Sequence, residues 1–312
     1  MQYFSKKYFD FEMLKNKMIE ILDRSSKMVY IYTMNQLPLS TRTQILHLLC
    51  EGNSLRATSR ITGTSINTVT KLLVDVGKAC QTYHDQHVVN VVSKRVQCDE
   101  IWSFVYAKEK NAPIEMKEDG LAGDIWTWTA LDADTKLIVS WFVGNRGADS
   151  AYNFMQDVVT RLKNRVQLTT DGHKVYLDAV ADAFMGQVDY AQLVKIYGVS
   201  TGEKGSAERK YSPVECLGAK KVAQIGSPDK KHVSTSFVER QNLTMRMHMR
   251  RFTRLTNAFS KKVENHCYAI ALHFMYYNFV RIHKSLRVTP AMEAGLTQDL
   301  WNVEDLVKLT EK

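Results

Sequence analysis

The spacing of apolar residues in the first part of the chain predicts three short helices, over residues 41–50, 55–62 and 65–76. Ser54 and Ser65 stand where the second and third helices need a side chain to cap their first turn. Gly63 lies between those two helices, at a turn. Two short helices joined by a tight glycine-containing turn, after a supporting helix, are the layout of a helix-turn-helix. We expect this unit over residues 40–80, with its last helix ending before Gly77 and a separate linker helix following.

The predicted last helix carries residues that suit contact with DNA. Such a helix can enter the major groove with its N-terminal residues against the base edges. Here these residues are small and polar or cationic: Ser65, Asn67, Thr68 and Lys71. Two cations on the preceding helix, Arg56 and Arg60, are placed to contact phosphates. The isolated pattern also fits an ordinary helical hairpin that binds no nucleic acid.

Alternation with a period of two indicates that the middle of the chain is β-rich. Strands are expected over residues 95–106, 125–132, 137–143 and 166–172. A hairpin turn is expected at 132–135, and a helix over 148–164. Three sequential strands, then a helix and a further strand, predict an α/β layer with a mixed sheet.

The remaining segments are less regular. Residues 200–232 are polar and contain glycine and lysine, so we expect loops there. The pattern from Ser236 to His283 is helical throughout. No fold is assigned to residues 1–39, and residues 297–312 are expected to form a C-terminal tail.

Composition narrows the class of protein. The chain has 312 residues, of which 45% are hydrophobic and 24% charged, as in globular proteins of about two domains. Lys and Arg number 42 against 33 Asp and Glu, which favours nucleic acid as a partner before an acidic membrane surface. No apolar run is long enough to span a membrane, and the first residues lack the apolar core of a secretory signal. The five scattered cysteines contain no C-x-x-C pair, which argues against a zinc ribbon and fits a reducing cytoplasm.

Three acids are candidates for the chemistry. Asp99 and Asp171 stand at strand ends, and Glu239 leads a predicted basic helix. A single strand-end aspartate is more often a cap or a turn former. Together, however, carboxylates from separate elements can hold two Mg²⁺ ions about 4 Å apart, which activate an attacking oxygen and stabilise the leaving oxygen of a phosphodiester. Glu100 and Asp178 could assist such a site or be ordinary neighbouring groups.

A run of cations follows Glu239, without an acid before residue 264. These cations would bind the same DNA backbone that the metals attack. Its members are Arg240, Arg246, Arg250, Arg251, Arg254, Lys261 and Lys262.

Four stretches of sequence resemble bacterial DDE transposases, and most closely the family of insertion sequence one. They are residues 98–102 (CDEIW), 170–172 (TDG), 237–242 (FVERQN), and 277–278 (YN) with 283–290 (HKSLRVTP). The resemblance extends over residues 41–296. Many members of this class carry an N-terminal cysteine-rich zinc element, whereas residues 1–49 contain no cysteine. Any contribution of that segment to DNA binding is therefore expected to need no zinc.

The resemblance implies an RNase H-like catalytic domain over residues 90–296, preceded by an all-α helix-turn-helix domain. It implies cutting and joining of transposon ends with Mg²⁺, or Mn²⁺ in its place. By matching position, Asp99, Asp171 and Glu239 become the metal-binding catalytic triad, and Arg246 the basic partner of the glutamate. The implied partners are double-stranded DNA, as terminal inverted repeats and as target, and further copies of the chain in a synaptic complex. The expected location is the bacterial cytoplasm, at the nucleoid.

Two other functions stay open. One is a helix-turn-helix regulator whose catalytic domain has lost activity, which the presence of all three acids and Arg246 disfavours. The other is an RNase H-like nuclease that cuts DNA without joining it. Joined products would separate a transposase from both.

Overall fold

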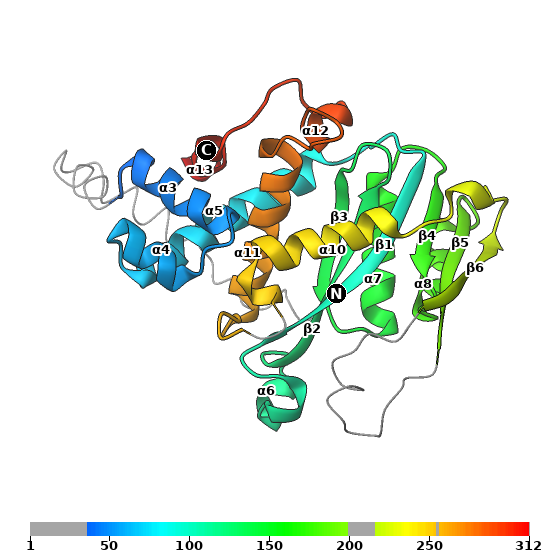
Figure 1. The fold of residues 1–312 in the computed structure, drawn as a ribbon, viewed down its shortest axis with the longest axis horizontal. Coiled ribbons are helices and arrows are strands. Elements are labelled where there is room, and N and C mark those ends of the chain that lie inside the picture. Colours follow the sequence, from blue (N-terminus) through cyan, green and yellow to red (C-terminus); the bar gives the residue numbers. More distant parts are fainter. Residues whose placement is uncertain (1–35, 199–215, 254–255, 312) are drawn as a thin grey trace, which may run out of the picture. The chain divides into compact units, whose positions relative to one another are not determined.

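The computed structural model describes residues 36–198, 216–253 and 256–311. The chain divides into two compact units, Met1–Arg42 and Thr43–Lys312. Residues 1–35 of the predicted N-terminal segment lie outside the described residues, as does Arg254. The description below concerns the second unit and helix α3, which leads into it (Figure 1).

Six strands form one mixed sheet with the order β3-β2-β1-β4-β5-β6. Strands β1 to β3 are antiparallel neighbours, β4 and β5 run parallel to β1, and β6 is antiparallel to β5. The predicted α/β class and mixed sheet are therefore confirmed. The strands are β1 (Arg95–Val105), β2 (Gly123–Asp132), β3 (Ile138–Gly144), β4 (Gln167–Asp171), β5 (Asp189–Tyr197) and β6 (Cys216–Ile225).

Helices flank this sheet and form the N-terminal part of the unit (Figure 1). Helices α7 and α8 enclose the main core against the sheet, with Trp128, Phe154 and Tyr176 fully buried in it. The described helices are α3 (Leu39–Cys50), α4 (Leu55–Thr62), α5 (Ile66–His87), α6 (Ile114–Glu118), α7 (Ala148–Arg161), α8 (Val175–Phe184), α10 (Ser236–His248), α11 (Val263–Met275), α12 (Pro290–Glu293) and α13 (Val303–Lys308).

Helices α3, α4 and α5 occupy the segments in which three helices were predicted. Ser54 Oγ accepts a hydrogen bond from the Ala57 N–H, and Ser65 Oγ accepts one from the Asn67 N–H, so both predicted caps are present. Gly63 ends α4 in the left-handed conformation, with φ 64°, which a glycine adopts without steric cost.

The prediction that the third helix ends before Gly77 was wrong, because α5 continues through it to His87. Gly77 lies where α5 packs against α11. A Cβ atom on it would stand 2.3 Å from the backbone carbonyl oxygen of Tyr268. The glycine therefore permits close contact between two helices and does not end one, a distinction that a single sequence cannot reveal.

Two further predictions need correction. Strand β6 lies inside the segment 200–232 that was expected to be loops. It is an edge strand exposed on both faces, so its residues show no apolar alternation. The segment from Ser236 to His283 is not helical throughout, because the chain leaves the helix between α10 and α11. There Ser260 forms a β-bridge with Val105 and accepts a hydrogen bond from the Tyr106 N–H.

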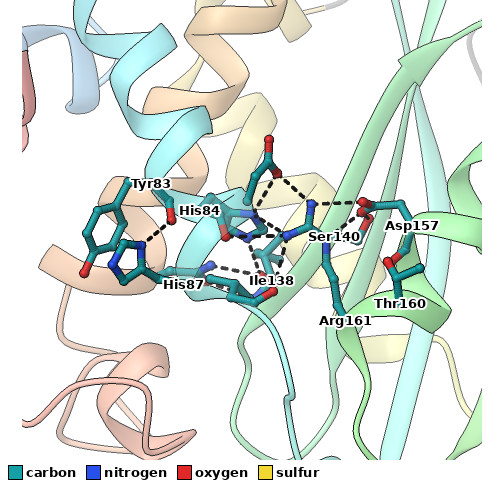
Figure 2. A network of polar contacts seen from close by, with 11 residues as sticks. Tyr83, His84, His87, Ile138, Ser140, Asp157, Thr160 and Arg161 are labelled. Carbon is teal, nitrogen blue, oxygen red and sulfur yellow. Dashed lines mark hydrogen bonds and ion pairs between the residues drawn. The ribbon is translucent and has the colours of Figure 1, made fainter.

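A buried polar network joins α5 to the sheet layer (Figure 2). Arg161, at the end of α7 and 7% exposed, donates to Asp157 on its own helix and to Asp85 on α5, at 2.6 Å each. It also donates to the Val88 carbonyl oxygen at 3.2 Å. His84 on α5 lies 3.3 Å, through Nε2, from the Ile138 carbonyl oxygen of β3. The network satisfies a buried cation and fixes the C-terminal end of α5.

Within the described ranges, no helix is both long and apolar enough to cross a membrane.

Replacement of Gly77 by alanine is expected to lower the free energy of unfolding by about 2 kcal/mol, because the added methyl group must separate α5 from α11. Alanine is the better helix former, so helix propensity acts in the opposite direction. Gly218→Ala on β6 is the control, since a Cβ atom there meets no atom within 4 Å. Chemical denaturation of the two variants measures the difference, and equal stabilities would contradict close packing at Gly77.

Candidate active site

The candidate site lies where two parallel strands stop pairing. The last pair between β1 and β4 is Gln97 with Thr169. Beyond it β1 stays paired with β2 and gains a further bridge only at Val105, to Ser260, while β4 continues with β5 as far as Asp171. Asp99 and Glu100 stand two and three residues after Gln97, so acids from both strands lie near the point where the strands separate.

Three carboxylates gather at this point. Asp99, Glu100 and Asp171 each offer an oxygen atom, and these atoms all lie within 4.8 Å of one another. Carboxylate oxygens are the ligands that Mg²⁺ prefers in proteins. The group is thus chemically suited to a divalent cation. Of the three predicted catalytic acids, the structure brings Asp99 and Asp171 together, with Glu100 as the third member in place of Glu239.

Glu100 is buried and held from two sides. Arg146, in the turn between β3 and α7, donates from Nε to Glu100 Oε1 at 2.8 Å. The Tyr176 hydroxyl of α8 donates to the other oxygen, Oε2, at 3.0 Å. The Arg146 guanidinium also lies over the Trp126 ring, 4.6 Å from its centroid. These contacts fix the orientation of the Glu100 carboxylate.

Asp99 faces the other side of the sheet, where α10 packs. Gln97 Oε1 accepts hydrogen bonds from the backbone N–H groups of Phe237 and Val238, in the first turn of α10. Asn242, farther along α10, donates from Nδ2 to Asp99 Oδ2 at 2.8 Å. Two polar side chains of β1 therefore position the helix that carries Glu239.

Glu239 is engaged by a lysine. Lys195 on β5 donates to Glu239 Oε1 at 2.6 Å, and the Thr235 hydroxyl donates to the same oxygen at 2.5 Å. Glu239 is close enough to contribute to the raised pKa of Asp99. Arg246 lies on the same helix, two turns after Glu239, and is exposed. Its predicted role as the basic partner of the glutamate stays a prediction.

Crowding of negative charge changes the acidity of the site. Burial, then the neighbouring charges of Glu100, Asp171 and Glu239, raise the pKa of Asp99 from 3.8 to about 7. Burial and the charge of Asp171 also raise the pKa of Glu100, and Arg146 opposes that shift. A cation bound among these carboxylates would relieve their mutual repulsion.

The predicted DNA-binding residues of α4 and α5 are exposed. Lys71 forms an ion pair with Asp75, one turn further along α5, at 2.5 Å. The exposed set is Arg56, Arg60, Ser65, Asn67, Thr68 and Lys71.

The cations of the predicted basic run after Glu239 differ in exposure and in hydrogen bonding. Arg240 and Arg250 are exposed. Arg251 donates to Ser260 Oγ at 3.1 Å and to the Asn265 carbonyl oxygen at 2.8 Å. Arg251 thus also holds the connection between α10 and α11 in place.

Several residues that shape the site were not predicted from the sequence. Asn242 lies within the motif FVERQN, so its position next to Glu239 was a usable signal. Nothing in the sequence pairs Lys195 with Glu239, or Arg146 and Tyr176 with Glu100, because these contacts join elements far apart in the chain. Asp178, on the exposed side of α8, is not in the carboxylate group.

In comparisons with known proteins, the chain matches no family model and no curated sequence.

The metal-free protein is expected to lose stability as the pH rises from about 4 to about 7. Folding raises the pKa of Asp99, so protonation of this residue favours the folded state. Its contribution to the free energy of unfolding is complete below the ordinary pKa of about 4 and is lost as the pH rises through about 7. Asp99→Asn should reduce this decline, leaving the part that comes from Glu100, and should be more stable than wild type at pH 8 by about 2 kcal/mol. Denaturation in EDTA at pH 5 and pH 8 measures it, with the exposed Asp178→Asn as control. A decline in Asp99→Asn as large as that of wild type would contradict the charge-crowding account.

Proposed function

We propose that this protein is a DDE-type transposase, which cleaves DNA at the ends of an insertion sequence and transfers the freed strands to target DNA with Mg²⁺. One observation carries the proposal: the group of Asp99, Glu100 and Asp171 at the point where β1 and β4 part. The order of the six strands, with helices packed on the sheet, is compatible with an RNase H-like catalytic domain. The stretches that resemble DDE transposases contain all three residues: Asp99 and Glu100 lie in CDEIW, and Asp171 lies in TDG.

Asp99 and Asp171 would hold the metal, with Glu100 and Glu239 as the two candidates for further ligands. The bound metal would supply activation of the attacking oxygen and stabilisation of the leaving oxygen. The chain's own residues prepare the site: Asn242 orients Asp99, and Lys195 balances the charge of Glu239. Mn²⁺ is expected to replace Mg²⁺, because it accepts the same oxygen ligands.

Helices α4 and α5 are proposed to bind the terminal inverted repeats as a helix-turn-helix. Support comes from the capped, exposed N-terminus of α5 and the exposed Arg56 and Arg60 beside it. Pairing of two DNA ends would require at least two copies of the chain. A nuclease that cuts without joining uses the same carboxylates, so the assay must detect joined strands as well as cleaved ones.

Replacement of Asp99 or Asp171 by alanine is expected to abolish cleavage and joining of end DNA, while DNA binding changes less than threefold. Metal ligation needs the carboxylates, whereas affinity for DNA comes mainly from phosphate contacts. Denaturing gels with labelled ends, with and without Mg²⁺, measure activity. Asp178→Ala is the matched control and should stay fully active. Wild-type activity of Asp171→Ala would refute the proposal.

The same assay distinguishes the two glutamates. Glu100→Gln keeps an oxygen that can accept from Arg146, and its amide NH2 can donate to the Tyr176 hydroxyl oxygen, but it removes one charge from the carboxylate group. If Glu239 completes the site when metal binds, Glu239→Gln should lower activity by at least a hundredfold, and Glu100→Gln by much less. The reverse order would identify Glu100 as the third ligand.

Substitutions on α4 and α5 are expected to separate recognition from general affinity. Asn67→Ala or Thr68→Ala should reduce discrimination between end DNA and random DNA by about tenfold, since each loses base contacts. Arg56→Ala should weaken binding to both DNAs alike and reduce the salt dependence of binding. Competition binding at two salt concentrations measures both quantities. Unchanged discrimination in Asn67→Ala and Thr68→Ala would exclude this docking of α5.

A further inference from the structure

A cavity of about 1050 Å³ lies between α4, the start of α5, and residues 250–251 and 256–262, which lie between α10 and α11. Asn67 and Thr70 line it from α5, and Lys261 and Lys262 line it from the end of the second of these stretches. Asn265, on α11, lies at its wall. The described lining contains none of the carboxylates of the candidate active site, so this is a second, separate place for a ligand.

The charged side chains that line the cavity are cationic. Among the described residues that line it are five lysines and arginines and no aspartate or glutamate. Four of the five are exposed, and Arg251 is held by Ser260 and Asn265. A concave surface with this charge concentrates anions. The five are Arg56, Arg250, Arg251, Lys261 and Lys262.

A buried histidine in the lining lacks hydrogen-bond partners. His273 on α11 is 5% exposed, and neither of its ring nitrogens has a partner among the described residues. Burial lowers the pKa of His273 to about 3, so the ring is neutral and offers one donor and one acceptor. His248, also in the lining, has an unpartnered Nδ1. Buried polar atoms are usually paired, and unpartnered ring nitrogens that line a cavity are available to a ligand or water there.

The lining is also partly apolar, which a site for inorganic phosphate alone would not need. Leu55, Ile66 and Phe259 contribute apolar surface, and amide groups of Asn67 and Asn265 stand among them. Apolar walls with a few polar groups are typical of sites for organic ligands of this volume. An aromatic base can stack on apolar and ring surfaces while cations hold its phosphates.

We propose that this cavity binds a nucleotide, with the base toward His248 and His273 and the phosphates toward the lysines and arginines. The same chemistry is offered by a free nucleotide and by an unpaired nucleotide within a DNA strand. The proposal goes beyond DNA cleavage. Arg56 and Asn67 belong both to this cavity and to the proposed DNA-binding surface of α4 and α5. The variants that test the cavity are therefore those at Lys261, Lys262 and His273, outside α4 and α5.

The test is equilibrium binding of two probes, a fluorescent ATP analogue and a short labelled oligothymidine, to the full chain in EDTA. Lys261→Ala with Lys262→Ala should weaken binding of the favoured probe by at least tenfold. The matched control, Lys220→Ala with Lys230→Ala, removes two exposed cations outside the cavity and should change it less than twofold. Tighter binding of ATP supports a free nucleotide, and tighter binding of oligothymidine supports a nucleotide in a strand.

His273→Phe separates a ligand role from a structural one. It replaces the unpartnered imidazole with an apolar ring of similar shape, so the melting temperature should hold or rise while probe affinity falls at least fivefold.

Three results would overturn the proposal: binding of neither probe, equal losses in the cavity and control double variants, or pyrophosphate competing as well as ATP does. The first excludes a nucleotide ligand, the second indicates a diffuse cationic surface, and the third indicates a site for phosphate alone.

Discussion

The candidate active site depends on the separation of β1 and β4 after one short run of parallel pairing. Consecutive strand residues point to opposite faces, so Asp99 and Glu100 would ordinarily be kept apart by the sheet between them. Where β1 and β4 stop pairing, however, carboxylate oxygens of Asp99 and Glu100 both approach Asp171. Bringing these carboxylates together costs electrostatic energy. Arg146 forms an ion pair with Glu100, and Lys195 forms one with Glu239, and these two pairs offset part of the repulsion.

The same strand organises the elements around it. On one face, β1 contributes Val96 and Cys98 to the core that α7 and α8 cover. On the other, Gln97 caps α10 and Asp99 accepts from Asn242, which fixes the helix that bears Glu239. A change in the position of β1 would therefore displace the carboxylates and the flanking helix together.

How much the sequence reveals differs between local and long-range features. Helix caps at Ser54 and Ser65, and the strands β1 to β4, follow from patterns within a few residues and were predicted correctly. The exposed edge strand β6 has no alternation of apolar and polar residues, so it was missed. Gly77 was misread as a helix end because the residue that it packs against, on α11, is distant in sequence. In the site, Asp171 ends β4 as predicted, whereas the prediction that Asp99 stands at a strand end was wrong, because Asp99 lies within β1 and was found from its motif. The contact of Lys195 with Glu239 joins residues far apart in the sequence, so no local pattern predicts it.

The length of α5 has a mechanical consequence. Its 22 residues make a rod about 33 Å long at 1.5 Å per residue, anchored near one end by Arg161 and wedged against α11 at Gly77. For a stiff rod pivoting at its anchored end, a tilt of ten degrees displaces the far tip by about 6 Å, roughly one helical turn. The tip carries Ser65 and Asn67, so small errors in the seating of the anchored end become large errors in where those side chains meet a groove. The rigidity of the anchor thus sets the positional precision of the opposite end.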